Sequence, residues 1–151
     1  MSIFDSFSIN ASGLTAERYR MDVISENIAN IDTTRTEDGT PYRRKLVTFE
    51  EKGKNGTFAS ALAKAKGDYI GGGVRVGKTY EDTETEMKMV YDPSHPDADE
   101  NGYVTYPNVN VITEMTDLID ASRSYEANAT AFSASKSMAV KGLEMAPVSY
   151  T

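Results

Sequence analysis

The eight residues from Gly72 to Thr79 match the phosphate-binding pattern G-x-x-x-x-G-K-[ST] of nucleotide-binding enzymes. In such a loop, backbone N–H groups surround the phosphates, the lysine contacts them and the threonine hydroxyl holds magnesium. The context argues against this chemistry, because residues 68–70 do not form a buried apolar strand and residues 74–76 themselves alternate as a strand does. The segment between the two terminal helices, about 70 residues long, is also too short for the parallel sheet that such sites need. We therefore interpret the motif as a turn followed by a strand, and a small nucleotide-binding enzyme as the least favoured function.

A second motif resembles the first half of a calcium-binding EF-hand loop. Its members are Asp97, Asp99, Asn101 and Gly102. The last position of such a loop needs a bidentate acid, but Asn108 stands there, and two prolines upstream prevent the preceding helix. We predict a solvated acidic turn instead.

The single histidine, His95, has neither a second His nor a Cys with which to bind a metal. It is predicted to be a turn residue. The sequence therefore predicts no catalytic, cofactor-binding or metal-binding residue, and no cofactor.

The composition narrows the class of protein further. The chain has 151 residues, of which 39% are hydrophobic, with no Trp, no Cys and a formal net charge of -7. The negative charge argues against binding to nucleic acid or to an anionic membrane, and the lack of Cys excludes disulfides and thiolate sites. No apolar run is long enough for direct membrane insertion. The first residues do not form a basic segment followed by an apolar one, so we expect no cleaved signal peptide.

Apolar residues recur every seven positions near both ends of the chain, which predicts two long amphipathic helices. The first runs from about Ile3 to Ile31, or begins only after Ser12, because the glycine that follows costs about 1 kcal/mol inside a helix. The second begins at a cap formed by Asn110 or Thr113 and runs to about Leu143, with an acid at position 114 that suits the helix dipole. The residues predicted to form an assembly interface are Phe7, Leu14, Met21, Ile24, Ile28, Ile31, Val111, Met115, Leu118, Tyr125, Phe132, Val140 and Leu143.

Between the helices, short apolar runs separated by turn residues predict strands. The expected strands are residues 42–50, 74–76, 87–91 and 103–106. The Ala-rich stretch 57–66 is predicted to be either a short helix or an ordered loop.

The predicted fold class is α+β, with long N- and C-terminal helices forming a coiled-coil-like assembly domain and a small β-rich inserted domain. The helical domain comprises residues 1–35 and 108–151, and the β-rich outer domain residues 36–107. Two helices of this length present more apolar surface than they hide from each other, so we expect other subunits to cover the rest, as in a multi-helix tube. A two-helix core packed on a small sheet is the alternative structure, and a cytoplasmic helical adaptor that binds a soluble partner is the alternative function.

Residues 27–33, with the sequence Asn-Ile-Ala-Asn-Ile-Asp-Thr, resemble the N-terminal signature of the flagellar axial proteins of the bacterial rod and hook. Residues 41–45 are similar to the variant found in the proximal rod members of that family. Further similar segments are residues 72–76, 91–93, 101–104, 107–111, 121–128 and 134–138. The residues of the family motif are Asn27, Ala29, Asn30, Thr33, Tyr42, Arg43, Arg44, Pro107, Asn108, Ser122, Arg123 and Tyr125.

The resemblance implies a non-enzymatic structural subunit of the flagellar basal-body rod, which polymerises helically through its terminal helices into the proximal drive shaft. It implies export through the flagellar type III pathway without a cleaved signal peptide, and a place in the periplasmic, cell-envelope part of the basal body. The implied partners are other copies of the chain, other rod proteins including the distal rod, the ring and export-apparatus end of the basal body, and the export apparatus during secretion.

The polar residues of the N-terminal signature also have a physical interpretation. Asn27, Asn30, Asp32, Thr33 and Thr34 can bond to neighbouring backbone groups. We expect them to end the first helix in a defined geometry.

Overall fold

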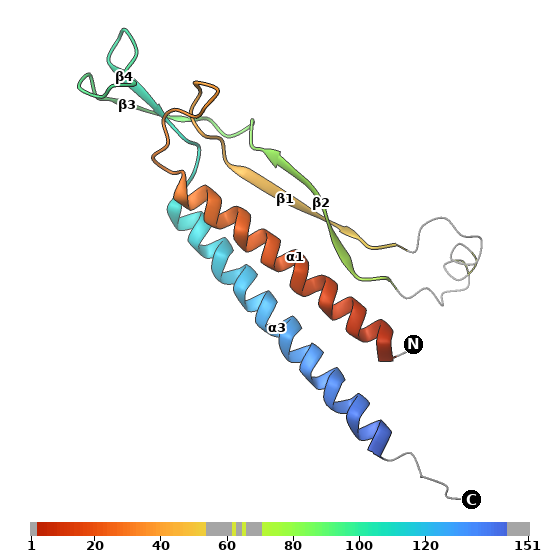
Figure 1. Cartoon of the computed structure of the whole chain (residues 1–151). Helices are drawn as coiled ribbons and strands as arrows, with labels where there is room; N and C mark the ends of the chain where they lie inside the picture. The colour runs from red at the N-terminus through yellow and green to blue at the C-terminus, as the bar shows by residue number, and fades with distance from the viewer. Residues whose placement is uncertain (1–2, 54–61, 63–64, 66–70, 145–151) are drawn as a thin grey trace, which may run out of the picture. The chain divides into compact units, whose positions relative to one another are not determined.

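The computed structural model describes residues 3–53, 62, 65 and 71–144, in which one long helix precedes the strands in the sequence and another follows them (Figure 1). The elements are α1 (Ile3–Ala29), β1 (Lys45–Glu51), β2 (Val74–Glu81), β3 (Lys88–Tyr91), β4 (Tyr103–Tyr106) and α3 (Val111–Glu144). This arrangement confirms the predicted α+β class. Most of the predicted segment 57–66 lies outside the described residues.

Residue contacts divide the chain into two compact units, each of which contains parts of both long helices and of strands. Unit 1 comprises residues 1–18, 49–76 and 122–151, and unit 2 comprises residues 19–48 and 77–121. The boundaries between a helical assembly domain and a β-rich outer domain stay a prediction.

Helix α1 begins before Gly13, so the expectation of a start after Ser12 is wrong. A Cβ atom at Gly13 would lie only 2.9 Å from Asn128 Oδ1 on α3, and the rings of Phe7 and Phe132 meet edge to face at 5.2 Å. The glycine therefore permits a close approach of the two helices in unit 1, and the packing that results offsets its low helix propensity.

Asn110 caps α3, which confirms the first of the two predicted caps, Asn110 and Thr113. Its Oδ1 accepts hydrogen bonds from the N–H groups of Ile112 at 3.0 Å and Thr113 at 3.4 Å. Thr113 therefore lies inside the first turn rather than at the cap. With 34 residues, α3 is about 50 Å long. Neither α1 nor α3, the two long helices of the described residues, is apolar enough over its length to cross a membrane.

The strands form two separate two-stranded sheets, β1 with β2 and β3 with β4. β3 and β4 are antiparallel and pair Lys88 with Tyr106 and Tyr91 with Tyr103. β1 begins at Lys45 rather than Tyr42. β2 is longer than predicted and includes all of residues 74–81, so the lysine and threonine of the phosphate-binding pattern lie on a strand and not at a helix N-terminus.

Candidate functional site: a buried polar network and an exposed helix face

The last turn of α1 places the side chain of Asn27 against the start of β1 and the first turns of α3. Its Nδ2 donates to the Lys45 carbonyl oxygen at 2.9 Å and to Glu114 Oε2 at 3.0 Å. Its Oδ1 accepts from the Tyr42 hydroxyl and from the Lys45 N–H, both at 2.9 Å. These are the four hydrogen bonds that an amide can form, and only 1% of Asn27 is exposed. One side chain thus joins three segments that are distant in the sequence.

Arg44 and Glu114 form the charged centre of the same network. Arg44 Nε donates to Glu114 Oε1 at 2.5 Å, and Arg44 Nη2 donates to Asp117 Oδ2 at 3.2 Å. Arg20 Nη2 on α1 lies 3.9 Å from the other oxygen of Asp117. Glu114 is fully buried, and a buried carboxylate is stable only when it is paired and hydrogen-bonded. Arg44 together with Asn27 meets that requirement.

Asn108 connects Arg44, the residue before β1, to the turn that follows β2. Its Oδ1 accepts from the Arg44 N–H at 2.8 Å, and its Nδ2 donates to the carbonyl oxygens of Asp82 at 2.9 Å and Thr85 at 3.2 Å. The Asp82 carboxylate accepts from the N–H groups of Glu84 and Thr85 and from the Thr85 hydroxyl. The turn therefore has a defined conformation that depends on its own side chains and on Asn108.

Two ionisable groups of the network have shifted pKa values. Burial raises the pKa of Tyr42 to about 12, and the negative charge of Glu26 adds to the shift. Hydrogen bonds from the hydroxyl and the N–H of Thr85 lower the pKa of Asp82 below its ordinary value. At neutral pH each group is in the form that its contacts require, because the Tyr42 hydroxyl donates and the Asp82 carboxylate accepts.

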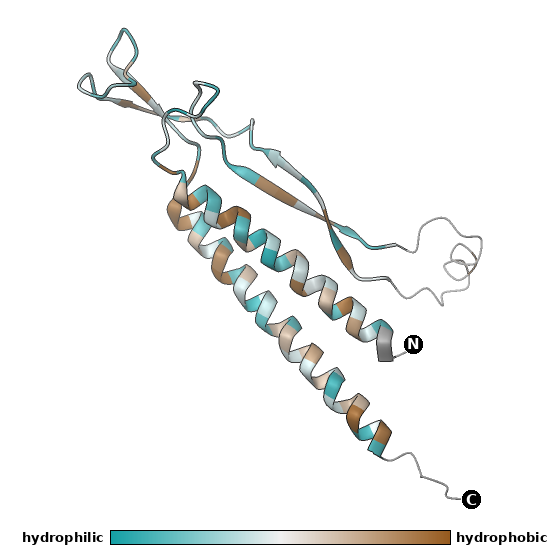
Figure 2. Cartoon of the chain, in the orientation of Figure 1, coloured by the Kyte–Doolittle hydropathy of each residue, from teal (hydrophilic) through white to brown (hydrophobic). Residues whose placement is uncertain are grey.

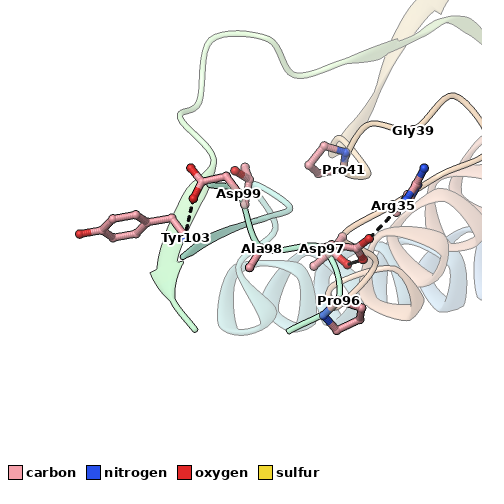
Figure 3. Close-up of a pocket in the computed structure, with 10 residues that line it drawn as sticks. Arg35, Gly39, Pro41, Pro96, Asp97, Ala98, Asp99 and Tyr103 are labelled. Atoms are coloured by element: carbon pink, nitrogen blue, oxygen red, sulfur yellow. Dashed lines mark hydrogen bonds and ion pairs between the residues drawn. The ribbon is translucent and has the colours of Figure 1, made fainter. Parts of the chain in front are cut away.

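An open pocket of about 350 Å³ lies between residues 34–41 and residues 96–105 of unit 2 (Figure 3). Thr34 Oγ1 donates to Asp97 Oδ2 at 2.8 Å, and Arg35 Nη1 lies 3.7 Å from Asp97 Oδ1. These contacts join the loop after α1 to the loop between β3 and β4.

The EF-hand-like motif lies in a hydrogen-bonded turn. The Asp99 carboxylate accepts from the N–H groups of Asn101 and Tyr103, and Asp97 is used in the pocket contacts. His95 lies in a turn, where its Nδ1 accepts from the Asp97 N–H at 3.1 Å. Across the part of the chain that the structure describes, no three His, Asp or Glu side chains converge to hold a metal ion.

Four residues of the family motif, from three separate segments, meet in the buried network. They are Asn27, Tyr42, Arg44 and Asn108. The other motif residues lie outside these contacts. Pro107 is buried next to Asn108, and Arg43 precedes β1. The end of α1 or the residues just after it include Ala29, Asn30 and Thr33, and α3 carries Ser122, Arg123 and Tyr125.

The expectation that the signature bonds to neighbouring backbone is confirmed for Asn30, whose Nδ2 donates to the Glu26 carbonyl oxygen at 2.9 Å. It is wrong for Asn27 and Thr34, which bond to residues distant in the sequence. Polar side chains at a helix end can serve either purpose, and the local sequence does not distinguish them.

The predicted assembly residues differ widely in exposure. Ile24 is buried, and Phe7, Leu14, Met21, Ile28, Ile31, Leu118 and Phe132 are half-buried. The exposed members are Val111, Met115, Tyr125, Val140 and Leu143. Hydrophobic residues, exposed and buried alike, recur along both helices (Figure 2). Which of these residues contact another subunit stays a prediction.

Sequence reasoning missed two sets of residues. Glu114 was expected only to suit the helix dipole, and its role and that of Asp117 depend on Arg44, which is about seventy positions away. Ile112 and Ile119 on α3 are 78% and 53% exposed. Ile112 and Ile119 are seven residues apart, and each directly follows a predicted interface residue, Val111 or Leu118. This spacing could have identified them from the sequence.

Comparison with known proteins gives concordant matches over nearly the whole chain. Residues 7–35 match the family model described as "Flagella basal body rod protein", and residues 100–145 match "Flagellar basal body rod FlgEFG protein C-terminal". The chain is 47% identical over 151 residues to the flagellar basal-body rod protein FlgC of Bacillus subtilis, which covers 96% of this chain and 99% of that protein. It is 47% identical over 146 residues to FlgC of Borreliella burgdorferi, with 91% and 93% covered. It is 39% identical over 145 residues to FlgC of Salmonella typhimurium, with 96% and 98% covered.

Proposed function

This chain belongs to the FlgC family of flagellar basal-body rod proteins and is a structural subunit of the rod; we propose that it polymerises helically through its terminal helices in the proximal part of the drive shaft. It assembles with other rod proteins in the basal body. In this proposal the chain has no catalytic role and its terminal helices supply the contacts between subunits.

The observation that carries the proposal is an exposed apolar face on α3. Ile112, Met115 and Ile119 are 78%, 54% and 53% exposed, and their spacing of three and four residues puts them on one side of the helix. Glu114 and Ala121 are fully buried on the opposite side of the helix. An apolar face that a chain does not cover itself marks an interaction site. We assign it to a neighbouring rod subunit.

The end of α3 supplies a second group of exposed apolar side chains in unit 1. Met138, Val140 and Leu143 are 66%, 45% and 78% exposed. α3 has 34 residues and α1 has 27, so α1 cannot cover α3 along its whole length. These residues are further candidates for contacts with neighbouring subunits.

In the proposed assembly the buried network has a positioning role. Asn27 and Arg44 attach α1 and β1 to the first turns of α3, which carry the exposed face. Each subunit of a helical polymer must present the same surface to its neighbours. A buried network in which every polar group has its partner suits such a subunit, because it holds the helices and the strand in one arrangement.

We further propose that the subunit reaches the periplasmic part of the basal body through the flagellar type III pathway without a cleaved signal peptide. Its neighbours in the proposal are other copies of itself, the ring and export-apparatus end of the basal body, and the distal rod. The support for this placement is the family membership.

The proposal is tested by deleting the gene in the source organism and complementing it with variants. The deletion should leave the membrane ring but remove rod, hook and filament in electron micrographs, and the unaltered gene should restore them. A variant with Ile112→Glu, Met115→Glu and Ile119→Glu should fail to restore them, because three buried charges would oppose the contact.

A matched control is Thr113→Glu, which adds a charge at an exposed position of the same turn. It should restore rods, since an acid in the first turn suits the helix dipole. Circular dichroism of the purified triple variant should retain the helix content of the unaltered chain. Complete flagella in the deletion strain would refute the rod function and favour the adaptor interpretation. Normal rods with the triple variant would refute the assignment of this face.

A further inference from the structure

The β3–β4 hairpin carries an exposed face that the rod contacts proposed above do not use. In the antiparallel register, Met89 pairs with Thr105 and Tyr91 with Tyr103, so these side chains lie on one face. Val90 and Val104 lie on the other face, where Val104 is completely buried. On the first face, Met89 is 62% exposed, Tyr91 64% and Tyr103 42%. Three large side chains on one small sheet are therefore open to solvent.

The two tyrosine side chains contact each other. Their rings meet edge to face, with centroids 5.2 Å apart and an interplanar angle of 66°. Gly102 in the adjoining turn has a φ of +80°, and a Cβ atom there would lie 2.9 Å from Tyr91 Cε2 and 3.2 Å from a side-chain atom of Pro93. The turn thus leaves room for the Tyr91 ring. Tyr103 also lines the open pocket described above, and Figure 3 shows its ring extending away from the other labelled residues. Tyr and Met side chains are enriched at protein–protein interfaces.

The negative charge of the chain is concentrated in the sequence segment that contains β3 and the loop after it. Residues 81–101 contain eight acidic residues and one lysine, so this segment alone carries a formal charge of -7, which equals the net charge of the whole chain. The rest of the sequence is neutral overall. Several of the carboxylates are exposed, namely Glu81, Glu84, Glu86, Asp99 and Glu100. Partners of opposite charge are attracted to such a segment and like-charged ones are repelled.

We propose that the exposed face of the hairpin, formed by Met89, Tyr91 and Tyr103, docks onto a Lys- and Arg-rich surface of a different protein. Pairing with the same face of a second copy would bring two segments of charge -7 together, which argues against self-association here. A basic partner suits both features of the surface, because Lys and Arg pair with the carboxylates and also lie over tyrosine rings. This surface is separate from the helix face assigned to polymerisation. The test nevertheless rests on the proposed function, because it is made in flagellated cells in which the chain is expected to form part of the rod.

The test is photo-crosslinking in whole cells. A benzophenone amino acid replaces Met89 in one strain and Tyr103 in another, and two positions keep the test valid if one substitution prevents assembly. The matched control replaces Tyr80 on β2, which is 48% exposed but not part of the hairpin. Adducts are identified by mass spectrometry of the crosslinked peptides, and each strain is examined for rods by electron microscopy.

We expect Met89 and Tyr103, but not Tyr80, to crosslink to a different protein through a peptide of net positive charge. The variant Glu84→Gln, Glu86→Gln and Glu100→Gln should reduce that adduct at least about fivefold. An adduct between two copies of this chain, an adduct on a neutral or acidic peptide, or no adduct would overturn the inference. Absence of the chain from rods together with the expected adduct would refute the rod function and leave this surface assignment standing.

Discussion

The side chain of Asn27 pairs with the backbone of Lys45 as a neighbouring strand would. Its Nδ2 donates to the Lys45 carbonyl oxygen and its Oδ1 accepts from the Lys45 N–H, both at 2.9 Å. The first residue of β1 is thereby attached to the last turn of α1. Since both backbone groups of Lys45 depend on one amide, the start of the strand and the end of the helix are coupled.

Replacing Asn27 with Ala should lower the free energy of unfolding by about 2–4 kcal/mol. The change leaves the Tyr42 hydroxyl and one oxygen of Glu114 buried without their partner, and buried polar groups without partners are costly. Urea unfolding followed by circular dichroism measures the difference. Asn30→Ala is the control, because that amide makes a local bond to α1, and it should cost no more than about 1 kcal/mol. Equal effects of the two changes would contradict the central place of Asn27.

The buried ion pair gives a second prediction. Arg44→Met should cost about 3–5 kcal/mol, because it leaves the fully buried Glu114 carboxylate without its cation. The double variant Arg44→Met with Glu114→Leu should be more stable than the single one by at least about 1 kcal/mol, since it removes the buried charge as well. Urea unfolding of both variants and of Glu114→Leu alone completes a double-mutant cycle. Additive losses would show that the two side chains act independently.

The raised pKa of Tyr42 predicts a loss of stability in alkali. The folded chain holds the phenol proton up to a pKa of about 12, whereas the unfolded chain releases it near the ordinary value of 10.0. Stability from this group is thus fully present below pH 10 and is lost as the pH rises from about 10 to about 12, by roughly 3 kcal/mol.

Tyr42→Phe provides the comparison for that titration. The variant should be about 1 kcal/mol less stable at pH 7, because Asn27 Oδ1 loses a donor, and it should lack this part of the alkaline loss. The difference between the two proteins isolates Tyr42 from the other tyrosines of the chain. Parallel stability curves from pH 9 to 12 would mean that Tyr42 ionises alike in both states.

Periodicity predicted the helices well, because both carry repeating apolar residues and recognisable ends. β2 was predicted too short, since Lys78 and Thr79 are polar and belong to a phosphate-binding pattern. Their strand conformation depends on pairing with β1, where Thr48 bonds to the Lys78 carbonyl oxygen and N–H. The buried network depends on pairings such as Asn27 with Glu114. Local sequence shows that such residues can form hydrogen bonds but does not identify the distant partner.

The start of α1 is the clearest case in which tertiary packing overrides propensity, and it leads to a last prediction. Gly13 costs about 1 kcal/mol as a helix residue, so Gly13→Ala should stabilise α1 if propensity alone acted. The new Cβ atom would instead lie 2.9 Å from Asn128 Oδ1, and Asn128 is held in place by a bond from its Nδ2 to the Ser124 carbonyl oxygen at 3.0 Å. The single variant should therefore gain nothing in free energy of unfolding and lose up to about 1 kcal/mol.

The same change in the background of Asn128→Ala should stabilise the chain by about 1 kcal/mol, because the steric conflict is gone and the gain in helix propensity remains. Gly142→Ala is the control: it lies inside α3 with no atom within 4 Å of the new Cβ, so it should stabilise α3 without any second change. Urea unfolding measures these effects in the unaltered chain, in the single variants Gly13→Ala, Asn128→Ala and Gly142→Ala, and in the double variant Gly13→Ala with Asn128→Ala. Equal gains from Gly13→Ala with and without Asn128 would mean that the helices do not approach closely at this point, and that the glycine has no packing role.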